Sequence, residues 1–232
     1  MTLLITGCNA QKYGRIKGSG DVISATRTVG SFEKVGVSGS FDVYLVKGKE
    51  GKEGKIDIKI EDNLLDYLVT EVKDGKLKIK WKKGTNISTR KGVVLTVYFK
   101  GINAVGLSGS GDIVAKDLIK TDHFKVAVSG SGDIDLELEA NTLEASVSGS
   151  GDLDLKGEVK EFSASVAGSG DISAYDLSSE KADLKVSGSG GMTLTVTKEL
   201  KAKVAGSGDI KYKGNPRIED IKVSGSGNVG TY

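Results

Sequence analysis

The sequence predicts an all-β chain folded mainly as a right-handed parallel β-helix, a β-solenoid with coils of about 19–20 residues. A glycine–serine motif recurs nine times, and from Gly109 onward its starts lie 18 to 21 residues apart. Apolar and polar residues alternate on both sides of each motif, as in residues 124–128 and 134–138, which is the pattern of strands. A fixed period of this length is typical of stacked repeats, in which each coil buries its apolar face only against its neighbours.

The alternation predicts two rows of inward side chains that run from coil to coil. The first row is expected to contain Val126, Val147, Val166, Val186, Val204 and Val223, and the second Ile113, Ile134, Leu153, Ile172 and Ile210.

Composition excludes several kinds of site. The chain has one His, one Cys and one Trp, so a zinc site of Cys and His, a disulfide within the chain and most His-based acid–base chemistry are excluded. Net charge is +2, with +2 over residues 1–42, +6 over residues 43–100 and −6 over residues 101–232, so nucleic acid is not expected as a partner. We therefore predict no enzyme and no cofactor; a polysaccharide-active enzyme is the less favoured alternative.

The N-terminal segment predicts a lipid anchor. Ile5-Thr6-Gly7-Cys8 resembles a bacterial lipobox, and the apolar residues before Cys8 are too few to span a bilayer. Residues 1–16 are interpreted as a lipoprotein signal remnant and linker, with lipidation at Cys8 tethering the chain to the outer membrane.

The repeated motif predicts a ladder of turns. Glycine accepts positive φ and close backbone approach, and Asp side chains cap N–H groups of turns. The expected ladder consists of Gly109, Ser110, Asp112, Gly130, Asp133, Gly149, Asp152, Gly168, Asp171, Gly206 and Asp209. A Ca²⁺ site at Asp133, Asp152 and Asp171 is the weaker alternative, because Gly191 and Asn228 interrupt the acidic column.

The folded part is expected to span residues 17–232. We assign residues 17–42 to the first coils, 43–100 to a small α+β insertion that caps the solenoid, and 101–232 to regular coils.

Within the insertion, residues 55–60 alternate as a strand and Asp74-Gly75 predicts a hairpin turn. A short helix is expected in EDNLLDYLVTEV, from the spacing of its apolar residues Leu64, Leu65, Leu68 and Val72. After the turn, Lys76, Lys78, Lys80 and Lys82 point away from Leu77, Ile79 and Trp81. The lysines predict contact with anions such as acidic glycans or lipid head groups, unless they form only a solvated strand face.

Taken together, "GSGDV", "FEKVGVSGSFDVYLV", "NLLDYLVTEVKDGKLKIK", "VYFKGINAVGLSGSGDI" and the successive "VSGSGD" coils resemble a bacterial family, the putative auto-transporter adhesin, head GIN domain. The resemblance covers about Lys17 to Val229, and Gly101-Ile102-Asn103 matches the eponymous triplet. It implies secreted or lipid-anchored proteins, mostly of Bacteroidota, with a parallel β-helix and an adhesive role. The family brings no catalytic residues. Residues 9–12 lack the acidic cluster that resembles a surface-export signal in that phylum, so the surface and periplasmic faces both remain open.

Two non-enzymatic functions follow. The first is an adhesin or binding module of the cell envelope, with a glycan or an envelope or host protein as its partner. The second is a structural protein of the envelope that assembles into homo-oligomers by stacking of solenoids.

Overall fold

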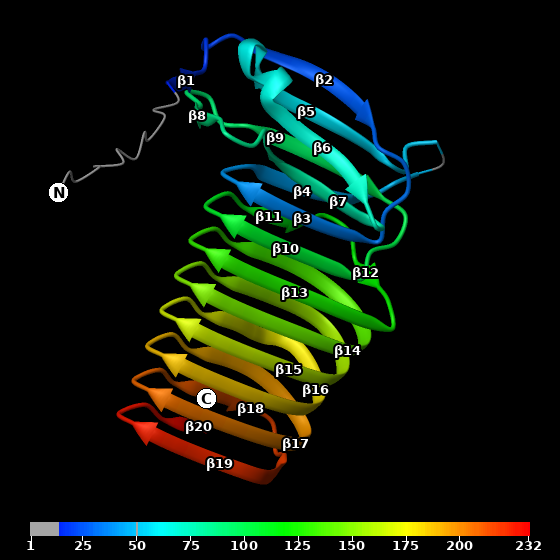
Figure 1. Cartoon of the computed structure of the whole chain (residues 1–232). Helices are drawn as coiled ribbons and strands as arrows, with labels where there is room; N and C mark the ends of the chain where they lie inside the picture. Colours follow the sequence, from blue (N-terminus) through cyan, green and yellow to red (C-terminus); the bar gives the residue numbers. More distant parts are fainter. Residues whose placement is uncertain (1–13, 50) are drawn as a thin grey trace, which may run out of the picture.

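The structure is a computed structural model that describes residues 14–49 and 51–232. It is almost entirely β-structure, wound into a solenoid of about seven turns, which confirms the predicted fold class. Figure 1 shows the coils stacked in chain order from the green to the red segments, with a more irregular cap at the N-terminal end.

Two parallel sheets form the walls of the solenoid. The first sheet stacks β3 (Lys34–Gly39), β10 (Ala104–Gly109), β13 (His123–Gly130), the second halves of β14 (Ile134–Gly149), β15 (Leu153–Gly168), β16 (Ile172–Gly188) and β17 (Met192–Gly206), and finally β19 (Arg217–Gly225). The second sheet stacks β4 (Asp42–Lys47), β11 (Ile113–Ala115), the first halves of β14 to β17, β18 (Ile210–Lys213) and β20 (Val229–Thr231). The short strand β12 (Ile119–Lys120) also pairs with β14.

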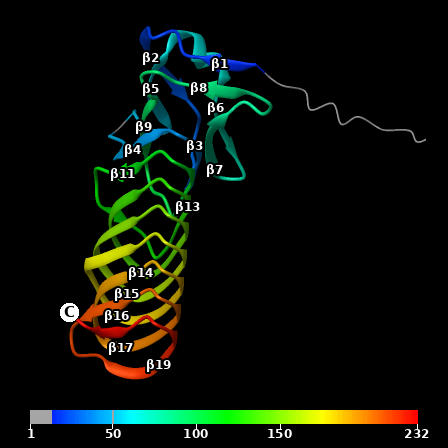
Figure 2. The ribbon, with the colours of Figure 1, turned by 90° about the vertical axis from the view of Figure 1, so that its left-hand side faces the viewer.

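The long strands pass from one sheet to the other without a break. In β14, buried and exposed residues alternate up to Glu139, the alternation fails at residues 140–142, and it resumes at Leu143. The chain bends there, so one strand supplies both walls of a coil, and Figure 2 shows the stacked coils from the side, turned by 90° from Figure 1. The core lies between the walls, where residues such as Ile134 and Val147 are at most 1% exposed.

The insertion extends both walls before it closes them. Strand β7 (Lys76–Trp81) pairs in parallel with β3, and β9 (Val94–Phe99) pairs in parallel with β4, so each sheet gains one further strand. Antiparallel strands follow, namely β6 (Leu68–Lys73) on β7, β5 (Lys55–Glu61) on β9, and β2 (Val22–Thr28) on β5. The last pair, β1 (Arg15–Lys17) and β8 (Asn86–Ser88), is parallel.

Arg27 connects the edges of the two sheets within the cap. Its guanidinium donates to the carbonyls of Leu65 and Leu68 at 2.9 and 2.6 Å and to the hydroxyl of Thr70 at 3.1 Å. The side chain therefore joins β2, at the edge of the second sheet, to β6, at the edge of the first. Such a closed end protects strand edges that would otherwise be free to pair.

The hairpin turn and the strands of the insertion form where predicted, but the helix differs. Asp74 and Gly75 both have positive φ, 53° and 70°, as the two-residue turn between β6 and β7 requires. The expected helix is only a six-residue 3₁₀ helix, η1 (Asp62–Tyr67), after which the chain becomes β6. Leu68 and Val72 are four residues apart, a spacing that places two residues on one face of a strand as well as of a helix. None of the helices in the described ranges is long and apolar enough to cross a membrane.

Two of the assigned boundaries are also corrected. Residues 43–47, assigned to the insertion, belong to β4, and residues 43–45 pair with β11 of the next coil. The Gly18 motif, assigned to the first coils, does not join the parallel stack, because the strand after it, β2, runs antiparallel to β5. A motif can specify a turn, but it does not specify which strand the next segment will pair with.

One predicted core row is shifted at its start. Val147 pairs with Val128, whereas Val126 pairs with Ala145, so Val126 belongs to the neighbouring row. The register follows the turn, since Val128 and Val147 each precede the glycine of their motif by two residues. The second row holds throughout, with Met192 completing it between Ile172 and Ile210.

Candidate functional site

The glycine turns stack so closely that backbone lies on backbone. A Cβ on Gly130 would lie 2.3 Å from the carbonyl oxygen of Gly109. The same oxygen accepts the N–H groups of Ser131 and Gly132 at 2.9 and 3.1 Å. These contacts repeat from coil to coil, so the glycines fix the distance between turns. Within residues 14–49 and 51–232, one pair of turn serines interacts through its side chains, and the hydroxyls of Ser40 and Ser110 lie 3.2 Å apart.

The repeated Asp residues hydrogen-bond along the stack. Oδ1 of Asp133 accepts the backbone N–H of Asp152 at 2.8 Å, and Oδ1 of Asp152 accepts that of Asp171 at 2.8 Å. Where the column is interrupted, Gly191 still donates its N–H to Asp171. Each carboxylate thus satisfies an N–H group of the following turn. In the described part of the chain, no group of three acidic, His or Cys side chains is placed to hold a metal ion.

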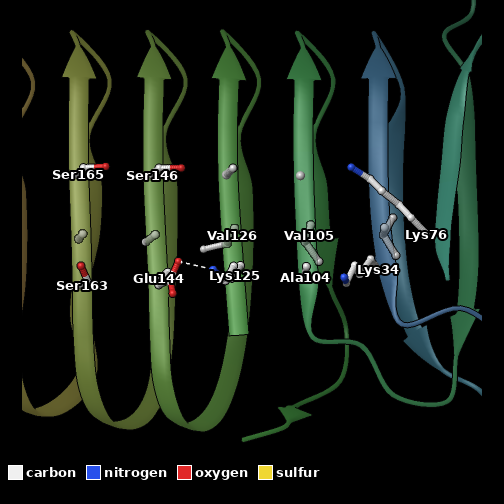
Figure 3. Close-up of a pocket in the computed structure, with 15 residues that line it drawn as sticks. Lys34, Lys76, Ala104, Val105, Lys125, Val126, Glu144, Ser146, Ser163 and Ser165 are labelled. Atoms are coloured by element: carbon white, nitrogen blue, oxygen red, sulfur yellow. Dashed lines mark ion pairs between the residues drawn. The ribbon is translucent and has the colours of Figure 1, made fainter. Parts of the chain in front are cut away.

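A groove of about 400 Å³ lies on the outer face of the first sheet (Figure 3). It crosses β3, β10, β13, β14 and β15, so it runs along the axis of the solenoid. Small outward residues form its floor, namely Ala104, Gly106, Ala127, Ser146, Ser163 and Ser165. Because these side chains are short, the groove exposes serine hydroxyl groups among small apolar side chains and strand backbone.

Two lysines make the cap end of this groove positive. Lys34 and Lys76 are register partners on β3 and β7, and Figure 3 shows both at the same end of the groove. Lys76 crosses its neighbour strand, since a Cβ on Gly36 would lie 2.4 Å from Cε of Lys76. Within the described residues neither ammonium has a carboxylate within 4.0 Å, whereas Lys125 further along is paired with Glu144 at 2.7 Å.

A second hollow of about 450 Å³ continues the groove toward the last coils. It shares Glu144 and Ser163 with the first and is lined further by Lys181, Asp183, Glu199 and Lys201. Charges of both signs are interspersed here, and Lys181 and Glu199 form an ion pair at 3.3 Å. The excess of positive charge is therefore confined to the cap end.

The four lysines singled out in the sequence occupy different surroundings. Lys76 lines the groove, while Lys80 and Lys82 line a separate hollow of about 610 Å³ beside Lys83. Lys80 pairs with Glu71 at 2.9 Å, and this hydrogen bond and charge lower the pKa of the Glu71 carboxyl.

Sequence reasoning missed Lys34, the other lysine of the groove. Its partnership with Lys76 joins segments 42 residues apart through strand pairing. No local signal in the sequence marks the two residues as neighbours, because each belongs to a different strand of the same alternating type.

Fold and groove together define the class of the protein, a β-solenoid that presents an extended outer face to its surroundings. The family model for the putative auto-transporter adhesin, head GIN domain matches residues 31–216, and the chain belongs to this family.

Three solved structures share the fold over nearly the whole chain. A protein from Bacteroides fragilis named a putative adhesin has a TM-score of 0.86 and 25% identity, covering 94% of this chain and 100% of its own. A protein from Parabacteroides distasonis named a putative lipid binding protein has a TM-score of 0.78 and 28% identity, with the same coverage. A putative adhesin from Parabacteroides merdae has a TM-score of 0.74 and 25% identity, covering 94% and 99%. No curated protein matches the chain.

The Gly101-Ile102-Asn103 triplet forms a structural corner. Ile102 is buried, the N–H of Asn103 donates to the carbonyl of Glu33 at 2.8 Å, and its carbonyl accepts the N–H of Lys125 at 3.0 Å. The triplet thus joins the coil before the insertion to the coils after it.

Proposed function

We propose that this protein is a non-enzymatic binding module of the cell envelope, an adhesin that holds an acidic glycan in the groove of the first sheet. The observation that carries the proposal is the pair of lysines without carboxylate partners among the described residues, Lys34 and Lys76, at the cap end of the groove. The adhesin family and its structural neighbours support the general role.

The groove suits an extended ligand. It runs across successive strands about 4.8 Å apart, so the same backbone and hydroxyl groups recur at a constant interval. Serine hydroxyls both donate and accept hydrogen bonds, which matches the hydroxyl groups of a sugar chain. The two ammonium groups then select a chain that carries carboxylates or sulfates.

A rigid scaffold favours binding over catalysis here. The groove brings together lysines, serines and one glutamate, and Glu144 is already paired with Lys125. A catalytic site of a polysaccharide-degrading enzyme would combine carboxylates at a set separation with a general acid or base. Depolymerisation of an acidic polysaccharide by the purified protein would contradict the non-enzymatic assignment.

We further propose that lipid on Cys8 anchors the protein to the outer membrane. Cys8 lies outside the described residues, and the support for this anchor is the lipobox-like sequence Ile5-Thr6-Gly7-Cys8. Labelling of the lipid on Cys8 tests it. Cells grown with labelled palmitate are expected to label the wild type and not the Cys8→Ser variant. Protease treatment of intact cells then separates the two faces, because only a surface-exposed chain is cleaved before lysis.

The groove is tested by a glycan array with the full chain carrying Cys8→Ser. Acidic glycans are expected to retain the protein, and Lys34→Ala with Lys76→Ala to weaken retention at least about tenfold, since each charge-assisted contact contributes on the order of 1.5–3 kcal/mol. Lys100→Ala, an exposed lysine beyond the end of β9, serves as the matched control and is expected to bind as the wild type does. Vesicles belong in the same screen, because one structural neighbour is named a putative lipid binding protein. Absence of binding to every acidic glycan would refute the proposal.

One observation favours the assembly function as a second candidate. In the last described coil, the inward-type residues Ile218, Ile221 and Val223 are 43%, 38% and 43% exposed, whereas their counterparts in the preceding coils are buried. An exposed apolar edge of this kind can accept a further strand. Sedimentation velocity over a range of concentrations is expected to reveal larger species if copies stack there, and a strictly monomeric protein would exclude this function.

A further inference from the structure

A second positive surface lies at the cap, on the elements through which the described chain begins. It is built on β1 and β8 and on the segments that flank β8. We call it the basic end, and it consists of Arg15, Lys17, Lys82, Lys83, Arg90 and Lys91. All six side chains are exposed.

Strand pairing brings these six residues together from two distant segments. Arg15 lies opposite Asn86 and Lys17 opposite Ser88 in the parallel pair of β1 and β8. The N–H of Gly18 extends the pairing by donating to the carbonyl of Ser88 at 2.9 Å. Two lysines of the basic end shortly precede β8 in the chain, and its second arginine and last lysine follow β8, so all four flank the strand that pairs with β1.

A buried carboxylate holds this region to the cap. Glu61 is 0% exposed, and its two oxygens accept the N–H groups of Gly20 at 2.8 Å and Arg90 at 2.9 Å. Gly18 has no room for a side chain, because a Cβ there would lie 2.1 Å from the Glu61 carboxylate. The chain after β1 and the chain after β8 are thereby fixed to the end of β5. The basic end is a built surface on the fold rather than a set of charges on a loose tail.

The charges of the basic end are not neutralised by ion pairs. Among the described residues, none of its six cations has a carboxylate within 4.0 Å. The exposed carboxylates on the adjoining elements are Asp21, Asp62, Asp66 and Glu71, and Glu71 is paired with Lys80 at 2.9 Å. Because Glu71 and Lys80 neutralise each other, the six cations face three other exposed anions, which leaves an excess of three positive charges, or of two when the buried Glu61 is counted as well. Asp62 is also occupied by the hydroxyl of Ser19, which lies at 2.5 Å.

We propose that the basic end lies on anionic lipid head groups and fixes how the solenoid stands on the membrane. This inference rests on the proposed lipid anchor. Cys8 precedes Gly14 by six positions in the chain, so the anchored lipid is at most about 20 Å from the start of the described chain. The surface that this short tether holds nearest the bilayer is the one that carries the six cations.

Two weak attachments then act together. A single acyl chain binds a membrane only marginally, and stable attachment requires a second signal such as a basic patch. Each Lys or Arg close to an anionic surface adds to the attraction, but only within about one Debye length of that surface.

The orientation has a consequence for the groove. Figure 1 shows β1 and β8 at one end of the molecule and the coils from β13 to β19 extending away from them. With the basic end on the membrane, the coils point away from the bilayer. The groove then lies along the side of the solenoid, with its positive end nearer the membrane and its other end open to the surroundings.

Flotation with lipid vesicles tests the proposal on the full chain carrying Cys8→Ser, so that no lipid is attached. The protein is expected to float with vesicles that contain phosphatidylglycerol, to remain behind with vesicles of phosphatidylcholine alone, and to be released by salt. Lys82→Glu with Lys83→Glu is expected to weaken binding at least about tenfold. Lys185→Glu with Lys203→Glu changes the net charge by the same amount on the outer face of distant coils, and it is expected to weaken binding less than about twofold.

The outcomes separate this inference from the proposed function. Equal losses in the two double variants would mean that net charge alone attracts the protein, and would overturn the basic end as a docking surface. Failure to float with anionic vesicles would overturn it as well, and neither result affects palmitate labelling at Cys8 or glycan binding. Circular dichroism of both variants verifies that each is folded, so that a loss of binding reports on the surface.

Discussion

Substitution of a turn glycine should damage the solenoid far more than its size suggests. In Gly149→Ala, the new Cβ would lie 2.3 Å from the carbonyl oxygen of Gly130 and 3.1 Å from its nitrogen and carbonyl carbon. Gly149 also has φ of +130°, which is disfavoured for any residue with a side chain. The obstacle is backbone of the preceding turn, which is held by its own hydrogen bonds and cannot rotate aside as a side chain does.

The magnitude follows from two separable costs. A residue forced into a sparsely populated backbone region costs of order 1–3 kcal/mol, and overpacking in a closely packed interior costs typically about 1–3 kcal/mol more. We therefore expect Gly149→Ala to lower the free energy of unfolding by about 3 kcal/mol or more.

Two other glycines separate the costs. Gly92 has φ of +75°, but a Cβ added there would meet no heavy atom within 4 Å, so Gly92→Ala should cost only about 1–2 kcal/mol. Gly101 has neither constraint, so Gly101→Ala should change stability by less than about 0.5 kcal/mol. Urea unfolding followed by circular dichroism gives the free energy of unfolding of each variant. The urea midpoint should be highest for Gly101→Ala, lower for Gly92→Ala and lowest for Gly149→Ala. A Gly149→Ala variant as stable as Gly92→Ala would refute the reasoning from backbone contact.

Three further predictions concern the ladder, the core and one ion pair. Asp152→Ala removes the acceptor of the Asp171 N–H and should lower the free energy of unfolding by about 1 kcal/mol, with Asp152→Asn, which keeps an acceptor oxygen, recovering most of it in the same urea assay. Phe124→Ala empties a site that is 1% exposed and should cost about 3–5 kcal/mol in thermal unfolding; a loss below about 1 kcal/mol would contradict its place in the core. Lys80→Ala should raise the pKa of Glu71, measured by NMR titration, because Lys80 supplies the hydrogen bond and the charge that lower it. The lowered pKa means that the Lys80–Glu71 pair stabilises the fold above about pH 4.5, and that this contribution is lost as the pH falls through the folded-state pKa. An unchanged Glu71 titration in the variant would contradict the role given to Lys80.

The regular coils are the part of the fold that sequence reasoning predicted best. From β13 onward every strand pairs with the same segment one repeat later, so local alternation and the glycine period contain nearly all the information needed. The small error at Val126 arose because alternation gives the face of a residue but not its row. The turn glycine fixes the row, and reading the register from Gly130 and Gly149 would have given Val128.

The cap was predicted less well because its order depends on distant pairings. The Gly18 motif has the same letters as the coil motifs, yet it meets Glu61 of β5 instead of another turn. Likewise, Lys82 and Lys83 lie between β7 and β8 in the sequence, and only the pairing of β1 with β8 brings the start of the described chain to the segment that follows them.

The repeat, the parallel stacking of its coils, the burial of one face of each strand and the family could all be recognised from the sequence. These features depend on interactions between equivalent positions of neighbouring repeats. A periodic sequence places similar residues at those positions, so the partners can be recognised from the period. Contacts in the folded chain are needed to show how the insertion closes the first coil, which lysines share the groove and which cations gather at the basic end. Those arrangements join segments of unlike sequence across about 40 to 70 residues, and no local pattern of charge or hydrophobicity specifies the partner.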